Sequence, residues 1–115
     1  MATTEGAIDP NDVRLKQLRI KTGVLKRLHK ELLCYEKEAT DETTKLDGLK
    51  SENAHPKEIE HQETILKETL NMIPGCKQRF EVAYEDLKSL VLESEELCDT
   101  ELYKGAQGLL NTIRI

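Results

Sequence analysis

The chain is poor in aromatic residues: its 115 residues include no tryptophan, one phenylalanine and three tyrosines. This shortage excludes a wide aromatic core, but it allows a narrow seam of leucine and isoleucine between long helices. Glycine numbers six and proline three, which is too few for many short strands joined by tight turns. With 34% charged residues, the composition predicts one all-α domain that resembles a coiled coil.

Long apolar runs and targeting signals are also missing. No apolar stretch approaches the length of a membrane-spanning helix, so we expect no membrane partner. The opening residues, MATTEGAIDPND, lack the basic-then-apolar pattern of a secretory signal, and a cytoplasmic location is expected. The net charge of −5 argues against a nucleic-acid partner, because such proteins usually carry a basic surface.

Residues typical of catalytic or metal sites do not form a recognisable pattern. The three cysteines are an odd number at wide spacing, and the three histidines do not share a helical face at metal-ligand spacing. No zinc-protease motif, phosphate-binding glycine loop or nucleophile elbow occurs. We therefore expect no enzyme activity, no metal and no cofactor, and we expect the cysteines to be free thiols.

The first helix is predicted over residues 10–50, after a flexible segment at residues 1–9. Asp9 is expected to cap it, with Pro10 in its first turn. A heptad row of apolar residues supports this helix, and it consists of Leu18, Leu25, Leu32, Ala39 and Leu46. A second row, interrupted by Glu42, consists of Leu28, Tyr35 and Leu49.

The second helix is predicted over residues 56–93, after a turn that ends near Pro56. Its main apolar row runs through Pro74 without a change of phase, and it consists of Ile59, Leu66, Ile73, Phe80 and Leu87. Leu70 belongs to a second predicted row, with Tyr84 and Val91. A proline inside a helix costs roughly 3 kcal/mol or more, so we predict a kink at Pro74. The alternative is a turn at Pro74–Gly75 that starts a long third helix.

A third, shorter helix is predicted over residues 97–113. The earlier apolar rows lose their phase after Val91, which places the turn within residues 92–99. A new stripe then appears, consisting of Leu102, Ala106, Leu109 and Ile113. The whole pattern predicts a single domain over residues 10–115, an antiparallel up-and-down three-helix bundle with a proline kink in its second helix.

Charge is unevenly distributed along the chain. Seven basic residues with no acidic residue among them lie within positions 14–30, and they are Arg14, Lys16, Arg19, Lys21, Lys26, Arg27 and Lys30. Seven acidic residues and one lysine lie within positions 85–101. Antiparallel folding would place the two segments side by side. Two interpretations stay open: the charges pair inside the molecule, or the basic segment docks an acidic partner.

Two segments carry a family resemblance, LRIKTGVLKRLHKELLCYEKEA at residues 18–39 and NMIPGCKQRFEVAYEDL at residues 71–87. Together, over about residues 13–110, they resemble the tubulin-folding cofactor A (tubulin-specific chaperone A) family. The resemblance implies an elongated, spectrin-like rod. It also implies a role in tubulin folding: capturing and holding β-tubulin released from the cytosolic chaperonin before αβ-tubulin dimers assemble.

The resemblance implies β-tubulin and other tubulin-folding cofactors as partners, and an association with the microtubule cytoskeleton. We expect a monomer or weak homodimer. The alternative is a non-enzymatic coiled-coil adaptor or dimerisation module, which its oligomeric state would reveal. Residues selected as candidate partner contacts are Lys16, Arg19, Lys21, Lys26, Arg27, Lys30, Tyr35, Pro74 and Gly75.

Overall fold

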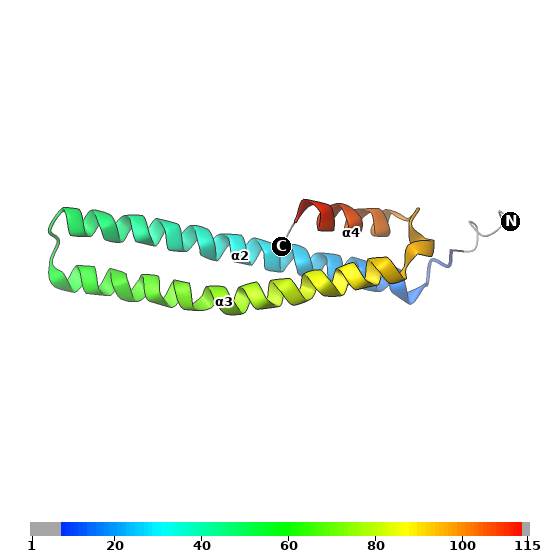
Figure 1. The fold of residues 1–115 in the computed structure, drawn as a ribbon, viewed down its shortest axis with the longest axis horizontal. Coiled ribbons are helices and arrows are strands. Elements are labelled where there is room, and N and C mark those ends of the chain that lie inside the picture. Colours follow the sequence, from blue (N-terminus) through cyan, green and yellow to red (C-terminus); the bar gives the residue numbers. More distant parts are fainter. Residues whose placement is uncertain (1–7, 114–115) are drawn as a thin grey trace. The chain divides into compact units, whose positions relative to one another are not determined.

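The computed structural model describes residues 8–113, and within this range it contains helices and no strand. Helix α2 spans Val13–Ser51, α3 spans Pro56–Glu93, and α4 spans Glu101–Thr112, with a short 3-10 helix, Glu95–Leu97, before α4 (Figure 1). The prediction of an all-α chain with three main helices is confirmed. Residues 1–7 of the expected flexible segment lie outside the described residues.

Helix α2 begins three residues later than predicted, and its cap is Asp12 rather than Asp9. The Asp12 side chain accepts a hydrogen bond from the backbone N–H of Arg14 at 2.9 Å. Asp9 closes the preceding turn instead: its carbonyl accepts from the N–H of Asp12, and its side chain accepts from the N–H of Asn11. Because Asp9 is engaged in this turn, the next acidic residue satisfies the exposed amides of the helix.

The turn between α2 and α3 is made by residues 52–55. Asn53 adopts a left-handed backbone with φ of 55°, a conformation that asparagine tolerates better than most residues. The next N–H, of Ala54, returns to the carbonyl of Leu49 at 3.0 Å. His55 then caps α3, because its Nδ1 accepts from the N–H of Lys57 at 3.1 Å, and Pro56 occupies the first helical position.

Helix α3 runs without a break through Pro74, so the alternative of a turn at Pro74–Gly75 is wrong. The helix continues because the residues after the proline still bury apolar side chains: Cys76 is fully buried and Phe80 is 6% exposed. This burial offsets the hydrogen bond that proline cannot make. The elongated, spectrin-like shape and the bend at Pro74 stay predictions.

Helix α4 begins at Glu101, four residues later than predicted. Leu97, the expected first residue, belongs to the 3-10 helix and is buried. Its carbonyl accepts hydrogen bonds from the N–H and the hydroxyl of Thr100, at 2.9 Å and 2.7 Å. Thr100 caps α4 by accepting from the N–H of Tyr103, so the α-helix cannot start before it. Along the predicted apolar stripe, Ala106 and Ile113 are buried and the two leucines are half-buried.

The chain divides into two compact units, which we call unit 1 (residues 1–27 and 81–115) and unit 2 (residues 28–80). Unit 1 contains the first part of α2, the last part of α3, and α4. The Tyr84 hydroxyl on α3 donates to the carbonyl of Leu110 on α4 at 3.4 Å. The buried apolar residues of unit 1 are Leu18, Leu25, Ala83, Leu87, Leu90, Val91, Leu97, Ala106 and Ile113.

Unit 2 is a hairpin of α2 and α3. Its buried apolar residues are Leu28, Leu32, Ala39, Leu46, Cys76 and Phe80. Two polar residues, Gln62 and Thr69, share this seam, whereas Leu70 is 48% exposed. The second predicted row on α3 is therefore wrong in this unit: the buried row lies one position earlier. The expectation of one domain over residues 10–115 stays a prediction.

Candidate partner-binding surface

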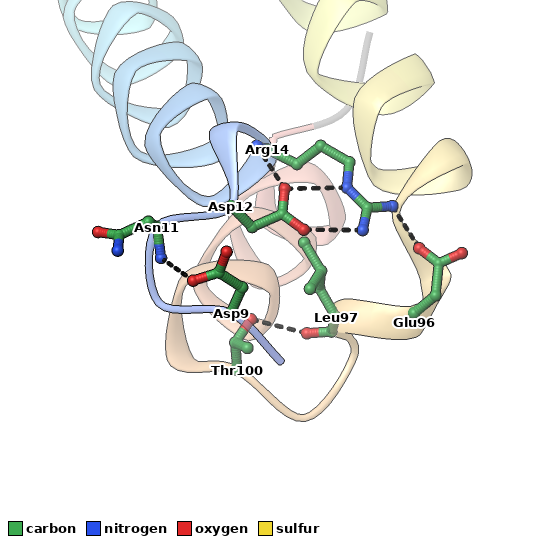
Figure 2. Close-up of polar contacts among 7 residues, drawn as sticks. All are labelled: Asp9, Asn11, Asp12, Arg14, Glu96, Leu97 and Thr100. Carbon is green, nitrogen blue, oxygen red and sulfur yellow. Dashed lines mark hydrogen bonds and ion pairs between the residues drawn. The ribbon is translucent and has the colours of Figure 1, made fainter. Parts of the chain in front are cut away.

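At the N-terminal end of α2, a network of polar contacts pairs one of the seven basic residues with acidic side chains (Figure 2). The Arg14 guanidinium donates to both carboxylate oxygens of Asp12, at 3.2 Å and 2.9 Å, and also pairs with Glu96. The hydrogen bonds from the Arg14 side chain and backbone lower the pKa of Asp12. The same two carboxylates raise the pKa of Arg14, with Asp12 the larger cause.

Internal pairing accounts for further basic residues of this segment. Lys21 is half-buried, and its Nζ lies 4.0 Å from a carboxylate oxygen of Asp86, within unit 1. Arg27 is exposed and also interacts within the molecule. The basic and acidic segments therefore do meet in unit 1, as one of the two interpretations of the charge distribution expected.

Four basic residues of the segment remain exposed, and their side chains make no ion pair or hydrogen bond within residues 8–113: Lys16, Arg19, Lys26 and Lys30. The first three belong to unit 1, and Lys30 belongs to unit 2. On an α-helix, residues separated by three, four or seven positions share a face. Lys16, Arg19 and Lys26 follow this spacing, so unit 1 presents three solvated cations on one side of α2.

The other predicted contact residues lie in unit 2 and have different surroundings. Tyr35 is half-buried on α2, whereas Pro74 is exposed on α3. Gly75 is half-buried, and a Cβ atom added there would lie 3.5 Å from the guanidinium of Arg79, an ordinary contact. Packing therefore does not require glycine at this position.

Unit 2 also exposes large apolar side chains that are not among the predicted contact residues. Leu33 is 51% exposed, Leu70 is 48% exposed and Met72 is 49% exposed. Leu33 falls outside both heptad rows of its helix, which was an available signal. The apolar pattern predicts that Leu70 is buried, because leucine is more hydrophobic than its neighbour Thr69, but Thr69 is the buried residue.

The described residues meet the requirements of neither a metal site nor a membrane-spanning helix. Within residues 8–113, no three acidic, histidine or cysteine side chains gather closely enough to hold a metal ion. No helix among the described residues is both long and apolar enough to cross a membrane. Cys34 and Cys98 are exposed free thiols, and Cys76 is a buried one.

Comparison with known proteins gives consistent matches. The family model described as "Tubulin binding cofactor A" matches residues 13–110. "Tubulin-specific chaperone A" of Gallus gallus is 42% identical over 104 residues, covering 90% of this chain and 96% of that protein. The protein of the same name from Homo sapiens is 39% identical over the same length and coverage.

Solved structures agree with the sequence matches. The human tubulin chaperone cofactor A structure superposes with a TM-score of 0.80 at 38% identity, covering 89% of this chain and 99% of that chain. Tubulin folding cofactor A from Arabidopsis thaliana also gives a TM-score of 0.80, at 37% identity, with coverage of 87% and 94%.

Proposed function

Since the chain belongs to the tubulin binding cofactor A family, we propose that it captures β-tubulin released from the cytosolic chaperonin and holds it before αβ-dimer assembly. Relatives that cover most of this chain are named tubulin-specific chaperones, which supports a holding role without catalysis. The proposal places the protein in the cytoplasm, with other tubulin-folding cofactors receiving the client.

The docking proposal rests on one observation: some basic residues of α2 are paired inside the molecule, and others are not. Arg14 and Lys21 are paired inside unit 1, while Lys16, Arg19 and Lys26 stay solvated and unpaired within the described residues. Solvated cations steer an acidic partner into contact and raise the rate of encounter. Because exposed ion pairs contribute only about 0–1 kcal/mol each, the client would also be released readily.

Apolar contacts would add to this charge-driven capture. Leu33, Leu70 and Met72 of unit 2 are about half exposed, and burying such side chains against a client favours association through the hydrophobic effect. Tyr35 and Pro74 belong to the same unit and remain proposed contacts. In this proposal the cations raise the rate at which the client is encountered, and the apolar side chains lengthen the lifetime of the complex.

A native-gel capture assay tests the function. Labelled β-tubulin, freshly released from chaperonin, is titrated with the chain, and α-tubulin and actin serve as control clients. A discrete new band with β-tubulin only is the expected result. No band with any client, from protein shown to be helical, would favour the coiled-coil adaptor, and its oligomeric state would then be measured.

A charge reversal tests the docking residues. Exchanging Lys26 and Lys30 for glutamate is expected to weaken capture roughly tenfold, because two attractive contacts become repulsive. Both side chains are exposed, so the far-ultraviolet circular dichroism should not change. The matched control exchanges Lys57 and Lys67 of α3, also exposed, for glutamate. Equal capture by the two double variants, with helicity retained, would refute the docking proposal.

A further inference from the structure

Unit 1 contains a cavity at the point where the chain enters α2. Its volume is about 290 Å³, close to the lower end of the roughly 300–1,000 Å³ typical of ligand pockets. It is lined by Pro10, Asn11, Asp12, Leu15, Lys16, Arg19 and Leu102. These residues come from the turn before α2, the first two turns of α2 and the first turn of α4.

The cavity carries uncompensated positive charge. Its one carboxylate, on Asp12, already accepts hydrogen bonds on both oxygens from Arg14, as Figure 2 shows. The two cations of the lining, Lys16 and Arg19, have no side-chain partner within residues 8–113. The N-terminus of α2 is capped by the Asp12 carboxylate, so the positive charge at the cavity comes from these two side chains.

The lining also has an apolar part. Leu15 and Leu102 are both half-buried, on α2 and α4 respectively, and both border the cavity. A ligand that fits this arrangement carries carboxylates beside an apolar group. The guanidinium of Arg19 suits a carboxylate, because its donors can bind two oxygens at once.

The cationic surface continues beyond the cavity within unit 1. Lys26 lies seven residues after Arg19, on the same face of α2, and ten residues after Lys16, a rise of about 15 Å. An extended peptide of about five residues spans this distance, at roughly 3.3 Å per residue. Between them, at Gly23, a Cβ atom would meet nothing within 4 Å, so the backbone is open to approach. This length favours an extended peptide over a small anion.

We infer that the cavity and the adjoining face of α2 bind an acidic peptide segment of the client. An apolar side chain of the segment packs on Leu15 and Leu102, and its carboxylates pair with Lys16, Arg19 and Lys26. The inference deepens the proposed function and rests on it, because it takes the segment to be part of β-tubulin.

Fluorescence anisotropy with a defined peptide tests the inference. The probe is the fluorescein-labelled peptide Glu-Glu-Leu-Glu-Glu, with Gln-Gln-Leu-Gln-Gln and Glu-Glu-Gly-Glu-Glu as control peptides. The full chain should bind the first probe most tightly. Exchanging Lys16 and Arg19 for glutamine should weaken binding roughly tenfold or more, since two charge-assisted contacts are lost. The matched variant, with Lys57 and Lys67 exchanged for glutamine, should bind like the unmodified chain.

Several results would overturn the inference. Equal affinity of both double variants, or no binding by the unmodified chain, would show that the cavity is not the peptide site. Sedimentation that reveals a dimer, dissociated by the Lys16 and Arg19 exchange, would identify a second copy as the occupant instead.

The native-gel assay on the same preparations separates this failure from failure of the proposed function. A β-tubulin band without peptide binding overturns only the cavity inference. Peptide binding without a β-tubulin band supports the preference of the cavity for acidic peptides and overturns β-tubulin as its source.

Discussion

Unit 1 and unit 2 use the same two long helices but bury different kinds of side chain. In unit 1, α4 adds a third element, and fully buried apolar residues such as Leu18 and Leu87 lie among its helices. In unit 2, α2 and α3 pair alone, and their seam includes the polar residues Gln62 and Thr69. Gln62 satisfies its amide by donating to the backbone carbonyl of Glu42 at 3.1 Å.

The difference shows what a third helix contributes. A helix in a two-helix hairpin has one buried side, so unit 2 closes its seam with polar and mixed contacts. Among these are the stacking of His29 on Phe80, with ring centroids 5.5 Å apart, and the Lys50–Glu63 pair at 3.8 Å. Exposed apolar side chains do not distinguish the units, because unit 1 also carries them, on Val13, Ile20, Val82 and Leu92. From the cores alone, we expect unit 1 to supply most of the stability.

Truncating one buried leucine in each unit is expected to give the largest difference in stability between the two units. Leu87→Ala in unit 1 is expected to lower the free energy of unfolding by about 3–5 kcal/mol, because three helices hold the cavity open. Leu46→Ala in unit 2 should cost less, about 2–3 kcal/mol, since a two-helix seam can relax or admit water. Urea denaturation measures both, and Leu92→Ala, on a side chain 71% exposed, is the control. A larger loss of unfolding free energy in Leu46→Ala than in Leu87→Ala would show that unit 2, not unit 1, supplies most of the stability.

Replacing the proline of unit 2 is expected to increase stability rather than lower it. Pro74→Ala is expected to raise the free energy of unfolding by about 1–3 kcal/mol, because alanine restores an N–H and removes the ring clash. The Pro74 side chain is exposed, so little packing is lost, and Gln78→Ala serves as an exposed control on the same helix. Thermal unfolding and the native-gel assay are measured together. Greater stability with weaker capture would support a binding role for the proline, whereas lower stability would assign it to packing.

The polar seam of unit 2 gives the smallest expected effect. Glu42 interrupts an apolar row of α2, and its Oε1 is buried without a hydrogen-bond partner in the described residues. Glu42→Leu is expected to raise the free energy of unfolding by about 1 kcal/mol, because it removes an unsatisfied polar atom and extends the seam. Glu38→Leu, at an exposed position, should change stability by less than about 0.5 kcal/mol. A loss of stability in Glu42→Leu would mean that the carboxylate is satisfied by solvent.

The main features of the fold could be predicted because they follow from repeating local patterns. The heptad row from Leu18 to Leu46 is buried along its whole length, and α3 passes through Pro74 as the unbroken phase indicated. Such predictions succeed because a helix of fixed period presents the same face at every seventh residue.

The errors fall where one residue competes with a neighbour for the same role. Asp12 rather than Asp9 caps α2, and Thr69 rather than Leu70 faces the seam. In each case both residues suit the role by type, and the choice depends on how the chain packs several residues away. The predicted start of α4 is wrong for another reason: Leu97 lies in a 3-10 turn that the Thr100 hydroxyl closes.

The sequence by itself determined the helical periods, the turn at residues 52–55 and the accumulation of basic residues early in α2, because these depend on residue type and spacing. Only the tertiary structure decided which cations are paired: Arg14 meets Glu96 and Lys21 meets Asp86, while Lys16 and Arg19 border an open cavity with Leu102. These contacts join residues more than sixty positions apart, and no local pattern specifies them.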